Sequence, residues 1–271
     1  MTRWIINARM YAVTPEVERG WQALLEQVAL EAGIGLSYLP YPAPQPLEPL
    51  WARADLGLVF MCGYPIAQQL APVVPIAAPI PTAPWAQGRA VYRTDLIVRQ
   101  DAPYRSLEDT FGGRAGYTVA HSHSGFNAFR HHLLGYRTPQ RPVLYREMLG
   151  NLITARNILD SVRAGRIDVG PLDAYWHELI SRHAPQLTAG VRVLATTATA
   201  PMPALVAAAT VPQDTVERLR AALLGVSARP WFGAYGELLQ LEGFAAVTKN
   251  SYSLMLDWER EALAAGYDQP A

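Results

Sequence analysis

Strand and helix patterns alternate through the first part of this 271-residue chain, and this alternation limits it to an α/β fold. A long helical pattern begins at Thr14-Pro15 and ends at Gly33, residues that are typical of a helix start and a helix end. The predicted order is a strand, a helix, a strand, a short helix and a buried strand, over 3–8, 14–33, 34–38, 47–51 and 54–60. This order predicts a lobe built on a mostly parallel sheet.

The rest of the chain continues the same alternation. Strands are predicted over 90–99, 114–120, 167–170, 191–196 and 204–210, and helices over 106–109, 146–163, 173–182, 212–224, 231–241 and 252–265. The apolar segment 71–84 contains five prolines and cannot form a continuous helix. We expect two α/β lobes, the second (99–198) inserted into the first (1–98 plus 199–271). A hinge and an interlobe cleft would then hold a small ligand.

The composition argues against several classes of function. Lys plus Arg and Asp plus Glu both number 23, so the net charge is zero and gives no support to a nucleic-acid or membrane surface. No stretch approaches the roughly 18 apolar residues of a membrane span. The sequence lacks a secretory-signal pattern, because Trp4-Ile5-Ile6 is followed at once by Asn7. We therefore expect neither membrane insertion nor an export signal.

The run His121-Ser122-His123-Ser124-Gly125 is the strongest indication of a binding site. It lies directly before 126–134, whose apolar spacing is typical of a helix. A helix start presents backbone N–H groups without intrahelical partners, and two serine hydroxyls add further donors. The run therefore predicts a bound oxyanion rather than a bond being broken.

Some of these residues also have a purely structural interpretation. Ser122 and Ser124 are residues that commonly cap helices, and Asp173 could cap the helix that follows it. Asp168 is expected to support the turn after Gly165 rather than to contact a ligand.

Chemistries other than anion binding have weaker support. His121 and His123 suggest a metal pair, but no carboxylate or thiol completes a zinc set at a recognisable spacing, so no metal or cofactor is expected. A triad could be written from Ser124, His123 and Asp173, but the Gly-x-Ser-x-Gly turn of such enzymes is absent. Cys62 follows a strand end, where a cysteine packs as a small apolar side chain or acts as a nucleophile.

Three segments of the chain resemble the phosphate-, phosphonate- and phosphite-binding proteins of ABC transporters. They are the loop Ser122-His123-Ser124-Gly125, the upstream segment 92–98 and the segment 162–170. The chain is also similar to a branch of this family that has Met10-Tyr11 near its N-terminus and a Cys-Gly-Tyr-Pro element, here 62–65. The similarity in the order of elements covers nearly the whole chain. It implies the type 2 periplasmic-binding fold, with two α/β lobes around a hinge.

The resemblance implies a non-enzymatic solute-binding protein that holds a small phosphate-, phosphonate- or phosphite-like anion in the cleft. Such a protein is the substrate-binding component of an ABC transport system, and its partner is the permease. By matching position, Ser122, His123 and Ser124 would donate hydrogen bonds to the oxyanion. Tyr92 and Thr94 would line the cleft where the chain crosses between the lobes.

The remaining expected contacts come from other parts of the chain. By resemblance, Tyr64 would face the cleft from the first lobe, and Asp173 would accept a hydrogen bond from the ligand. Arg9 and Tyr11 leave the first strand at its C-terminal end, and Arg9 could pair with a ligand charge or with a neighbouring carboxylate. Many relatives carry a histidine where this chain has Ala155, so the ligand set of the phosphonate-binding relatives is incomplete here.

The place and role of the protein therefore leave alternatives open. The family is periplasmic, whereas a chain without a signal peptide fits the cytoplasm. A cytosolic sensor on the same scaffold would signal lobe closure to a partner. An enzyme on this scaffold would use Cys62 or a histidine on a small metabolite such as a thiamine-pathway pyrimidine.

Overall fold

The computed structural model describes residues 4–271, and the chain divides into two compact α/β units. Unit 1 comprises Met1–Val91 and Pro201–Ser253, and unit 2 comprises Tyr92–Ala200 and Leu254–Ala271. The C-terminal segment clusters with unit 2, whereas the sequence pattern assigned it to the first lobe. Two units of mixed helices and strands agree with the predicted fold class.

Unit 1 is built on a six-stranded sheet in the order β13-β4-β12-β3-β1-β2. Its elements are β1 (Trp4–Asn7), α1 (Pro15–Ala32), β2 (Leu36–Tyr38), α2 (Glu48–Trp51), β3 (Leu56–Met61), α3 (Gly63–Ala67), β4 (Val73–Pro81), β12 (Ala204–Ala208), α8 (Gln213–Leu224), α9 (Phe232–Leu239) and β13 (Leu241–Ala246). The expected first residue of β1, Arg3, lies outside the described residues. β1 pairs in parallel with β2 and β3, whereas β12 is antiparallel to β3 and β4, and β13 is antiparallel to β4.

The prediction of a mostly parallel sheet was wrong, because β12 runs antiparallel to both of its neighbours and β13 runs antiparallel to β4. Two strands of this sheet were also not predicted. β4 lies in the proline-rich segment, and β13 occupies the residues after α9, at the end of the predicted helix 231–241. Pro75 cannot donate a backbone hydrogen bond, and the register against β12 shifts there. Arg220 on α8 instead donates to the carbonyls of Pro75 (3.0 Å) and Ile76 (3.1 Å), which ties this irregular part of the strand to the helix.

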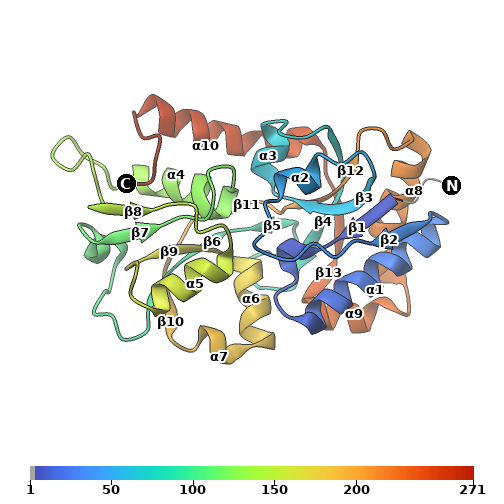
Figure 1. Cartoon of the computed structure of the whole chain (residues 1–271), viewed down its shortest axis with the longest axis horizontal. Coiled ribbons are helices and arrows are strands. Elements are labelled where there is room, and N and C mark those ends of the chain that lie inside the picture. Colours follow the sequence, from blue (N-terminus) through green and yellow to red (C-terminus); the bar gives the residue numbers. More distant parts are fainter. Residues whose placement is uncertain (1–3) are drawn as a thin grey trace. The chain divides into compact units, whose positions relative to one another are not determined.

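The helix α1 keeps the limits that its sequence predicts. Thr14 caps it by accepting a hydrogen bond from the N–H of Val17 at 3.3 Å, and Gly33 ends it in a left-handed conformation (φ 65°). Its buried Trp21 meets Phe60 of β3 edge to face at 4.9 Å. α1 packs against α8 and α9, and Figure 1 shows α1 and α9 on one side of the sheet with α2 and α3 on the other.

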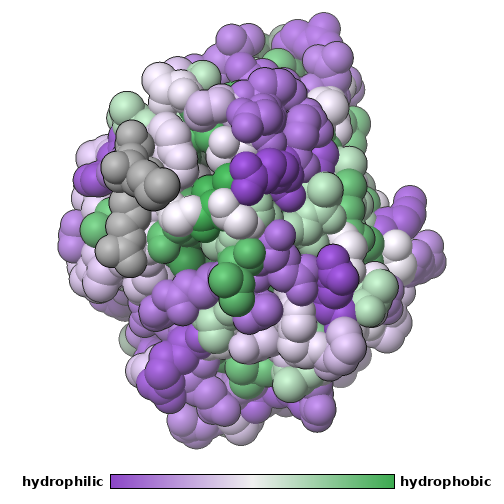
Figure 2. Space-filling view, turned by 90° about the vertical axis from the view of Figure 1, so that its right-hand side faces the viewer, coloured by the Kyte–Doolittle hydropathy of each residue, from purple (hydrophilic) through white to green (hydrophobic). Residues whose placement is uncertain are grey.

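The surface of unit 1 carries no single broad apolar area on the face seen in Figure 2, where green areas are broken up by polar purple ones. Large exposed apolar side chains of this unit include Leu30, Leu70 and Leu224. Scattered residues of this kind are normal on a protein surface. Within residues 4–271, no helix is both long enough and apolar enough to cross a membrane.

Unit 2 contains a three-stranded antiparallel sheet, β10-β6-β9, and a parallel pair, β7-β8. Its elements are β6 (Thr94–Arg99), β7 (Arg114–Gly116), α4 (Ala128–Leu134), β8 (Glu147–Leu149), α5 (Ala155–Arg163), β9 (Gly170–Asp173), α6 (Ala174–His183), α7 (Pro185–Thr188), β10 (Val191–Thr196) and, after its first residue, α10 (Ser253–Ala264). The short strands β5 (Val91–Tyr92) and β11 (Ala200–Pro201) lie where the chain passes between the units. Phe129 and Leu133 of α4 share a buried core with Leu96 and Val98 of β6.

The predicted helix over 146–163 was wrong in its first half. Glu147–Leu149 pairs with β7 as a strand, and helix α5 begins only at Ala155. Asn151 and Ile153 have positive φ angles (56° and 68°), which no α-helix contains. Thr154 then caps α5, since its hydroxyl accepts a hydrogen bond from the N–H of Asn157 at 3.1 Å. The apolar spacing here suggested a helix, but backbone turns and strand pairing determine the structure.

Two predicted strands of unit 2 have other limits in the structure. The strand expected over 114–120 ends at Gly116, because the chain turns and the N–H of Thr118 donates to the carbonyl of Gly125 (3.3 Å). The strand expected over 167–170 begins only at Gly170 and runs to Asp173, paired with β6. Both departures lie next to the predicted anion site, where the backbone is irregular.

Candidate functional site

The predicted helix start at Ser122 is present, and its first turn is unusually wide. Ser122 Oγ accepts a hydrogen bond from the N–H of Gly125 at 3.0 Å, as an N-cap does. The carbonyl of Ser122 accepts from the N–H of Asn127 at 3.0 Å, which makes His123–Asn127 one turn of π-helix before α4. We call residues 122–127 the capped turn. Single π-helical turns are frequent at functional sites.

The centre of the capped turn has no space for a side chain, so residue 125 must be glycine. A Cβ atom placed there would overlap Thr118 Oγ1 and would lie 2.9 Å from both Ser122 Oγ and Thr118 Cγ2. The backbone of Thr118 also holds the turn, through the hydrogen bond from its N–H to the carbonyl of Gly125. Only glycine therefore fits without a shift of neighbouring atoms.

Thr94 ties the capped turn to the sheet of unit 2. Its side chain is buried, and its Oγ1 donates a hydrogen bond to the carbonyl of Ser124 at 3.2 Å. Its backbone N–H donates to Thr197 Oγ1 at 3.0 Å, and in the strand register it stands opposite Asp173. The structure therefore brings Thr94, Ser124 and Asp173 together.

Asp173 has the capping role that was one of its two interpretations. Its Oδ1 accepts hydrogen bonds from the N–H groups of Tyr175 (2.9 Å) and Trp176 (3.0 Å), at the start of α6. These bonds use one carboxylate oxygen for the cap. The expected contact with a ligand stays a prediction.

A third helix start reaches the same region and was not expected there. The N–H of Ile153, directly before the α5 cap Thr154, donates to the carbonyl of Thr118 at 3.0 Å. Thr118 thus connects the capped turn with the start of α5. Thr154 is of a residue type that commonly caps helices, so it could have shown this helix start in the sequence, whereas nothing local to Thr118 shows its role. Ala155, the position of the absent family histidine, is the first residue of α5.

His123 lies inside the unit rather than on its surface. Its imidazole is 1% exposed, stacks on Trp258 at 5.2 Å and lies 6.0 Å from the ring of Tyr92, which is also buried. Burial, and to a lesser degree the positive charge of His131, lowers the pKa of His123 to about 3. The ring is therefore neutral at ordinary pH. Its expected hydrogen bond to an oxyanion stays a prediction.

The three candidates in unit 1 follow strands β1 and β3, which pair in parallel, so they leave the sheet at the same edge. Tyr11 is 1% exposed and meets the ring of Phe60 edge to face at 5.1 Å. Tyr64 is buried in the first turn of α3. The guanidinium of Arg9 donates to the carbonyl of Gln45. Contacts of these three residues with a ligand stay predictions.

The residues that were considered for a catalytic or metal-binding role are buried or take part in hydrogen bonds that support the fold. Cys62 is buried at the start of α3. Asp168 accepts a hydrogen bond from the N–H of Arg114 at 2.7 Å, and the Arg114 side chain bonds to the carbonyl of Gly165 at 2.7 Å, so both support this turn. No three His, Cys, Asp or Glu side chains in the described part of the chain are grouped so that they could hold a metal ion.

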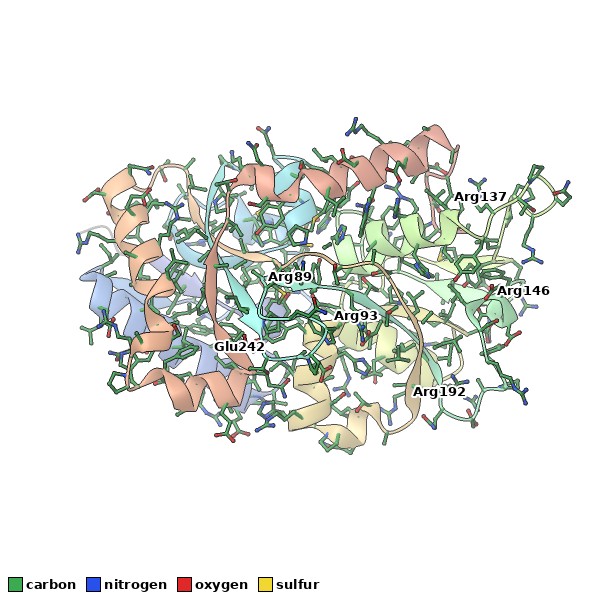
Figure 3. The ribbon with its side chains drawn as sticks, turned by 180° about the vertical axis from the view of Figure 1, so that it is seen from behind. Arg89, Arg93, Arg137, Arg146, Arg192 and Glu242 are labelled. Atoms are coloured by element: carbon green, nitrogen blue, oxygen red, sulfur yellow. The ribbon has the colours of Figure 1, made fainter. Side chains whose placement is uncertain are left out.

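Several arginines of unit 2 have protein partners, which are either carboxylates or backbone carbonyls. Arg137 donates to the carbonyl of Pro142 (2.8 Å) and Arg192 to that of Ala102 (3.1 Å). Figure 3 shows Arg137 and Arg146 at the end of unit 2 that is away from Arg93. The arrangement therefore offers an anion hydroxyl and amide donors rather than a cluster of cations.

Comparisons with known proteins show which family the chain belongs to. A profile of the phosphonate-binding family, described as periplasmic substrate-binding proteins of phosphonate ABC transporters, matches residues 12–252. No match is found among curated proteins.

Solved structures share the fold at low sequence identity. A binding component of an ABC phosphonate transporter from Pseudomonas aeruginosa has a TM-score of 0.79 at 15% identity, over 97% of this chain and 88% of that one. PhnD1 from Prochlorococcus marinus, solved with methylphosphonate, has a TM-score of 0.79 at 13% identity, over 97% and 98%. XAC2383 from Xanthomonas citri, solved with ATP, has a TM-score of 0.66 at 19% identity, over 98% of each chain.

Proposed function

The chain belongs to the family of periplasmic substrate-binding proteins of phosphonate ABC transporters, and we propose that its ligand is a small phosphonate-like oxyanion held at the capped turn. Solute binding is the function of this family. The proposal concerns the ligand class and the residues that contact it, which include Ser122 and Ser124, whereas Thr94 holds Ser124 in place.

The hydroxyl of Ser124 is the observation that carries this proposal. Ser124 is only partly buried, and within residues 4–271 its hydroxyl has no hydrogen-bond partner. It lies in the first turn of a helical run, where backbone N–H groups and the helix dipole favour an anion. Ser122 Oγ already accepts a hydrogen bond from Gly125, so its own proton can be donated to a ligand oxygen. Two hydroxyls and the amides of one turn match the several oxygens of a phosphonate group.

The residues of the site favour a tetrahedral oxyanion. They say less about the chemical group that is attached to it. Ala155 supplies no side-chain donor at the start of α5, where many relatives have a histidine. We therefore expect phosphonate, phosphite and phosphate to be the first ligands to test. Methylphosphonate, the ligand in the Prochlorococcus marinus structure, is a suitable first probe.

Binding without turnover is part of the proposal. Cys62 is buried, and His123 is a neutral ring stacked among aromatic side chains. Neither has the surroundings of an activated nucleophile or a general base that works near neutral pH. The family further suggests a membrane permease as the partner and the periplasm as the place of action.

Isothermal titration of Ser124→Ala with methylphosphonate, phosphite and phosphate tests the proposal. We expect the wild-type protein to bind at least one of these anions and the variant to bind it more than tenfold more weakly, with little change in stability. Ser181→Ala on α6 is the matched control and should keep the wild-type affinity. Equal affinities of wild type and Ser124→Ala would contradict the proposed site.

A further inference from the structure

Arg130 is a buried cation directly behind the capped turn. It lies in α4, and the residue is 3% exposed. Its Nη2 donates to Asn127 Oδ1 at 2.9 Å, its Nη1 donates to the carbonyl of Asp268 at 3.0 Å, and its guanidinium lies 5.0 Å from the centre of the Phe126 ring. Two of these three contacts are with residues of the capped turn itself.

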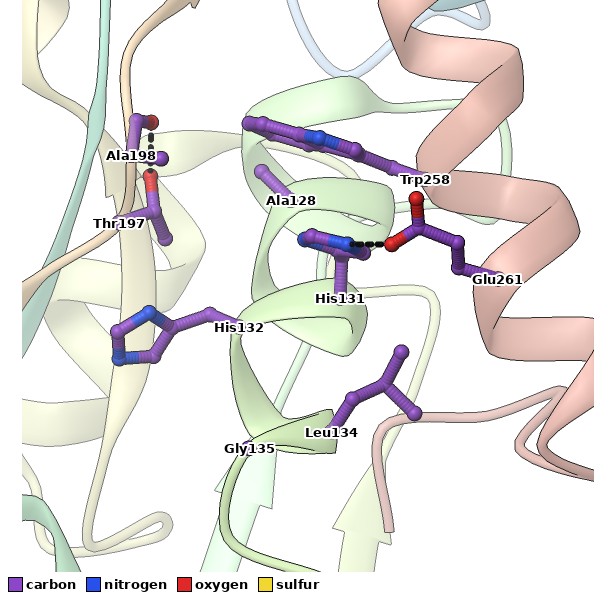
Figure 4. A pocket seen from close by; sticks show the side chains of 9 residues that line it. All are labelled: Ala128, His131, His132, Leu134, Gly135, Thr197, Ala198, Trp258 and Glu261. Carbon is purple, nitrogen blue, oxygen red and sulfur yellow. Dashed lines mark hydrogen bonds and ion pairs between the residues drawn. The ribbon is translucent and has the colours of Figure 1, made fainter.

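All of the contacts of Arg130 within residues 4–271 are with uncharged groups. Glu261 on α10 pairs with His131 instead, at 2.7 Å, as Figure 4 shows. A guanidinium removed from water is normally paired with a carboxylate, because carbonyl oxygens satisfy its hydrogen bonds but do not neutralise its charge. Arg130 therefore leaves one positive charge inside unit 2 without a carboxylate.

Asn127 connects this charge with the geometry of the turn. Its side chain is fully buried, accepts from Arg130, and donates through Nδ2 to the carbonyl of Met255 at 2.8 Å. An aspartate would fit the same space, but it would neutralise Arg130 and lose the donor to Met255. Asparagine keeps the turn in place and leaves the charge of Arg130 uncompensated.

We propose that Arg130 is the charge that makes the capped turn prefer dianions to monoanions, acting through the protein interior without contact with the ligand. This inference rests on the proposed function. Arg130 follows Gly125 by five residues, which corresponds to about 7 Å along a helix. With an effective dielectric constant of about 20, the Coulomb attraction between the guanidinium and the ligand anion is still substantial at that distance. This attraction doubles when the ligand charge doubles.

The test is the affinity of methylphosphonate for wild-type protein, Arg130→Gln and Asn127→Asp, measured on both sides of the second ionisation of the ligand. Arg130→Gln removes the charge, and Asn127→Asp neutralises it while the arginine stays in place. We expect both to weaken binding of the dianion about tenfold and of the monoanion about threefold. Arg99→Gln, which removes an exposed arginine of the same unit, should change neither affinity.

The outcomes distinguish this inference from a purely structural role. The inference would be overturned if a variant that circular dichroism shows to be folded lost the same affinity for both ionisation states of the ligand. It would also be overturned if such a variant lost no affinity at all. If the wild-type protein bound neither methylphosphonate nor phosphate, the proposed function would fail, and the inference with it. Because Asn127→Asp retains the guanidinium and the volume of the side chain, it serves if Arg130→Gln does not fold.

Discussion

The starts of α1 and of the capped turn have the same kind of cap but opposite properties toward an anion. Thr14 and Ser122 each accept a hydrogen bond from the N–H three residues later. After Thr14 come Pro15, which has no N–H, and two glutamates that satisfy the positive end of the helix. The first turn after Ser122 contains no acidic residue and has Gly125 where side chains would crowd.

On the proposed site, the difference means that a serine or threonine cap alone does not make an anion site. The residues of the first turn decide whether its N–H groups and dipole are already satisfied within the chain or are left for a ligand. By this criterion α1 is a structural helix start, and the capped turn is the helix start that we propose binds the anion.

The largest expected effect comes from Gly125→Ala, which closes the space in the capped turn. The new Cβ overlaps Thr118 Oγ1, so the turn must shift, and we expect methylphosphonate binding to be lost in titration calorimetry. The double variant Gly125→Ala/Thr118→Ala removes the overlapping atoms and should recover part of the affinity. Full binding by the single variant would show that the turn is not the site.

Ser122→Asp makes the capped turn resemble the start of α1. Aspartate caps as well as serine, so thermal stability should stay within about 0.5 kcal/mol of the wild type. Its carboxylate repels a bound oxyanion, and we expect the affinity for methylphosphonate to fall more than tenfold. Ser122→Asn, which caps without a charge, is the control. Unchanged affinity in Ser122→Asp would contradict the distinction between the two helix starts.

We expect a smaller effect on affinity at Asp173, whose carboxylate caps α6. Its capping role and its charge can be separated by substitution. Asp173→Asn keeps the cap but removes the negative charge, and we expect stability to be nearly unchanged. If Asp173 accepts a hydrogen bond from the ligand, the affinity for the methylphosphonate monoanion, which carries an O–H group, should drop about threefold in titration calorimetry. Asp173→Ala should also cost about 1 kcal/mol in urea unfolding, because the cap is lost. A normal urea midpoint for Asp173→Ala would contradict the capping role.

The smallest effect at neutral pH concerns His123. Its pKa is lowered to about 3 by burial, whereas an unfolded chain binds a proton at this side chain below about 6.5. The contribution of the neutral His123 to the free energy of unfolding should therefore be complete above about pH 6.5. It should fall as the pH decreases toward 3, by up to about 1.4 kcal/mol per pH unit.

The variant His123→Phe keeps an aromatic ring next to Trp258 and removes this proton. Urea unfolding at a series of pH values should show a shallower loss of stability in the variant than in the wild type. Identical pH profiles would show that His123 is not a buried neutral imidazole.

The sequence predicted unit 1 and unit 2 with different success. In unit 1 the helix α1 and the strands β1 to β3 follow local signals, such as Thr14-Pro15 and Gly33 at the helix ends. β4 was missed because prolines normally exclude an interior strand, and here the side chain of Arg220 compensates from a distant helix. Long-range contacts of this kind are not visible in a local pattern.

At the candidate site, too, the sequence predicted the features that have a local signal and missed those that depend on long-range contacts. Ser122 and its helix start were found because a cap is a local signal. The support from Thr118 and Arg130 depends on atoms that are brought together only by folding. The false helix over 146–163 shows the opposite error, since its apolar spacing is correct for a helix but Asn151 and Ile153 adopt positive φ angles.

The most direct measurement is the change in backbone amide chemical shifts when methylphosphonate is added to labelled protein. We expect the largest shifts at the amides of Ser124, Gly125 and their neighbours in the capped turn, and we expect them to saturate with the affinity measured by calorimetry. The amides of the first turn of α1, after Thr14, should not move. Saturating binding with unmoved amides at Ser124 and Gly125 would contradict the assignment of the anion site to this turn.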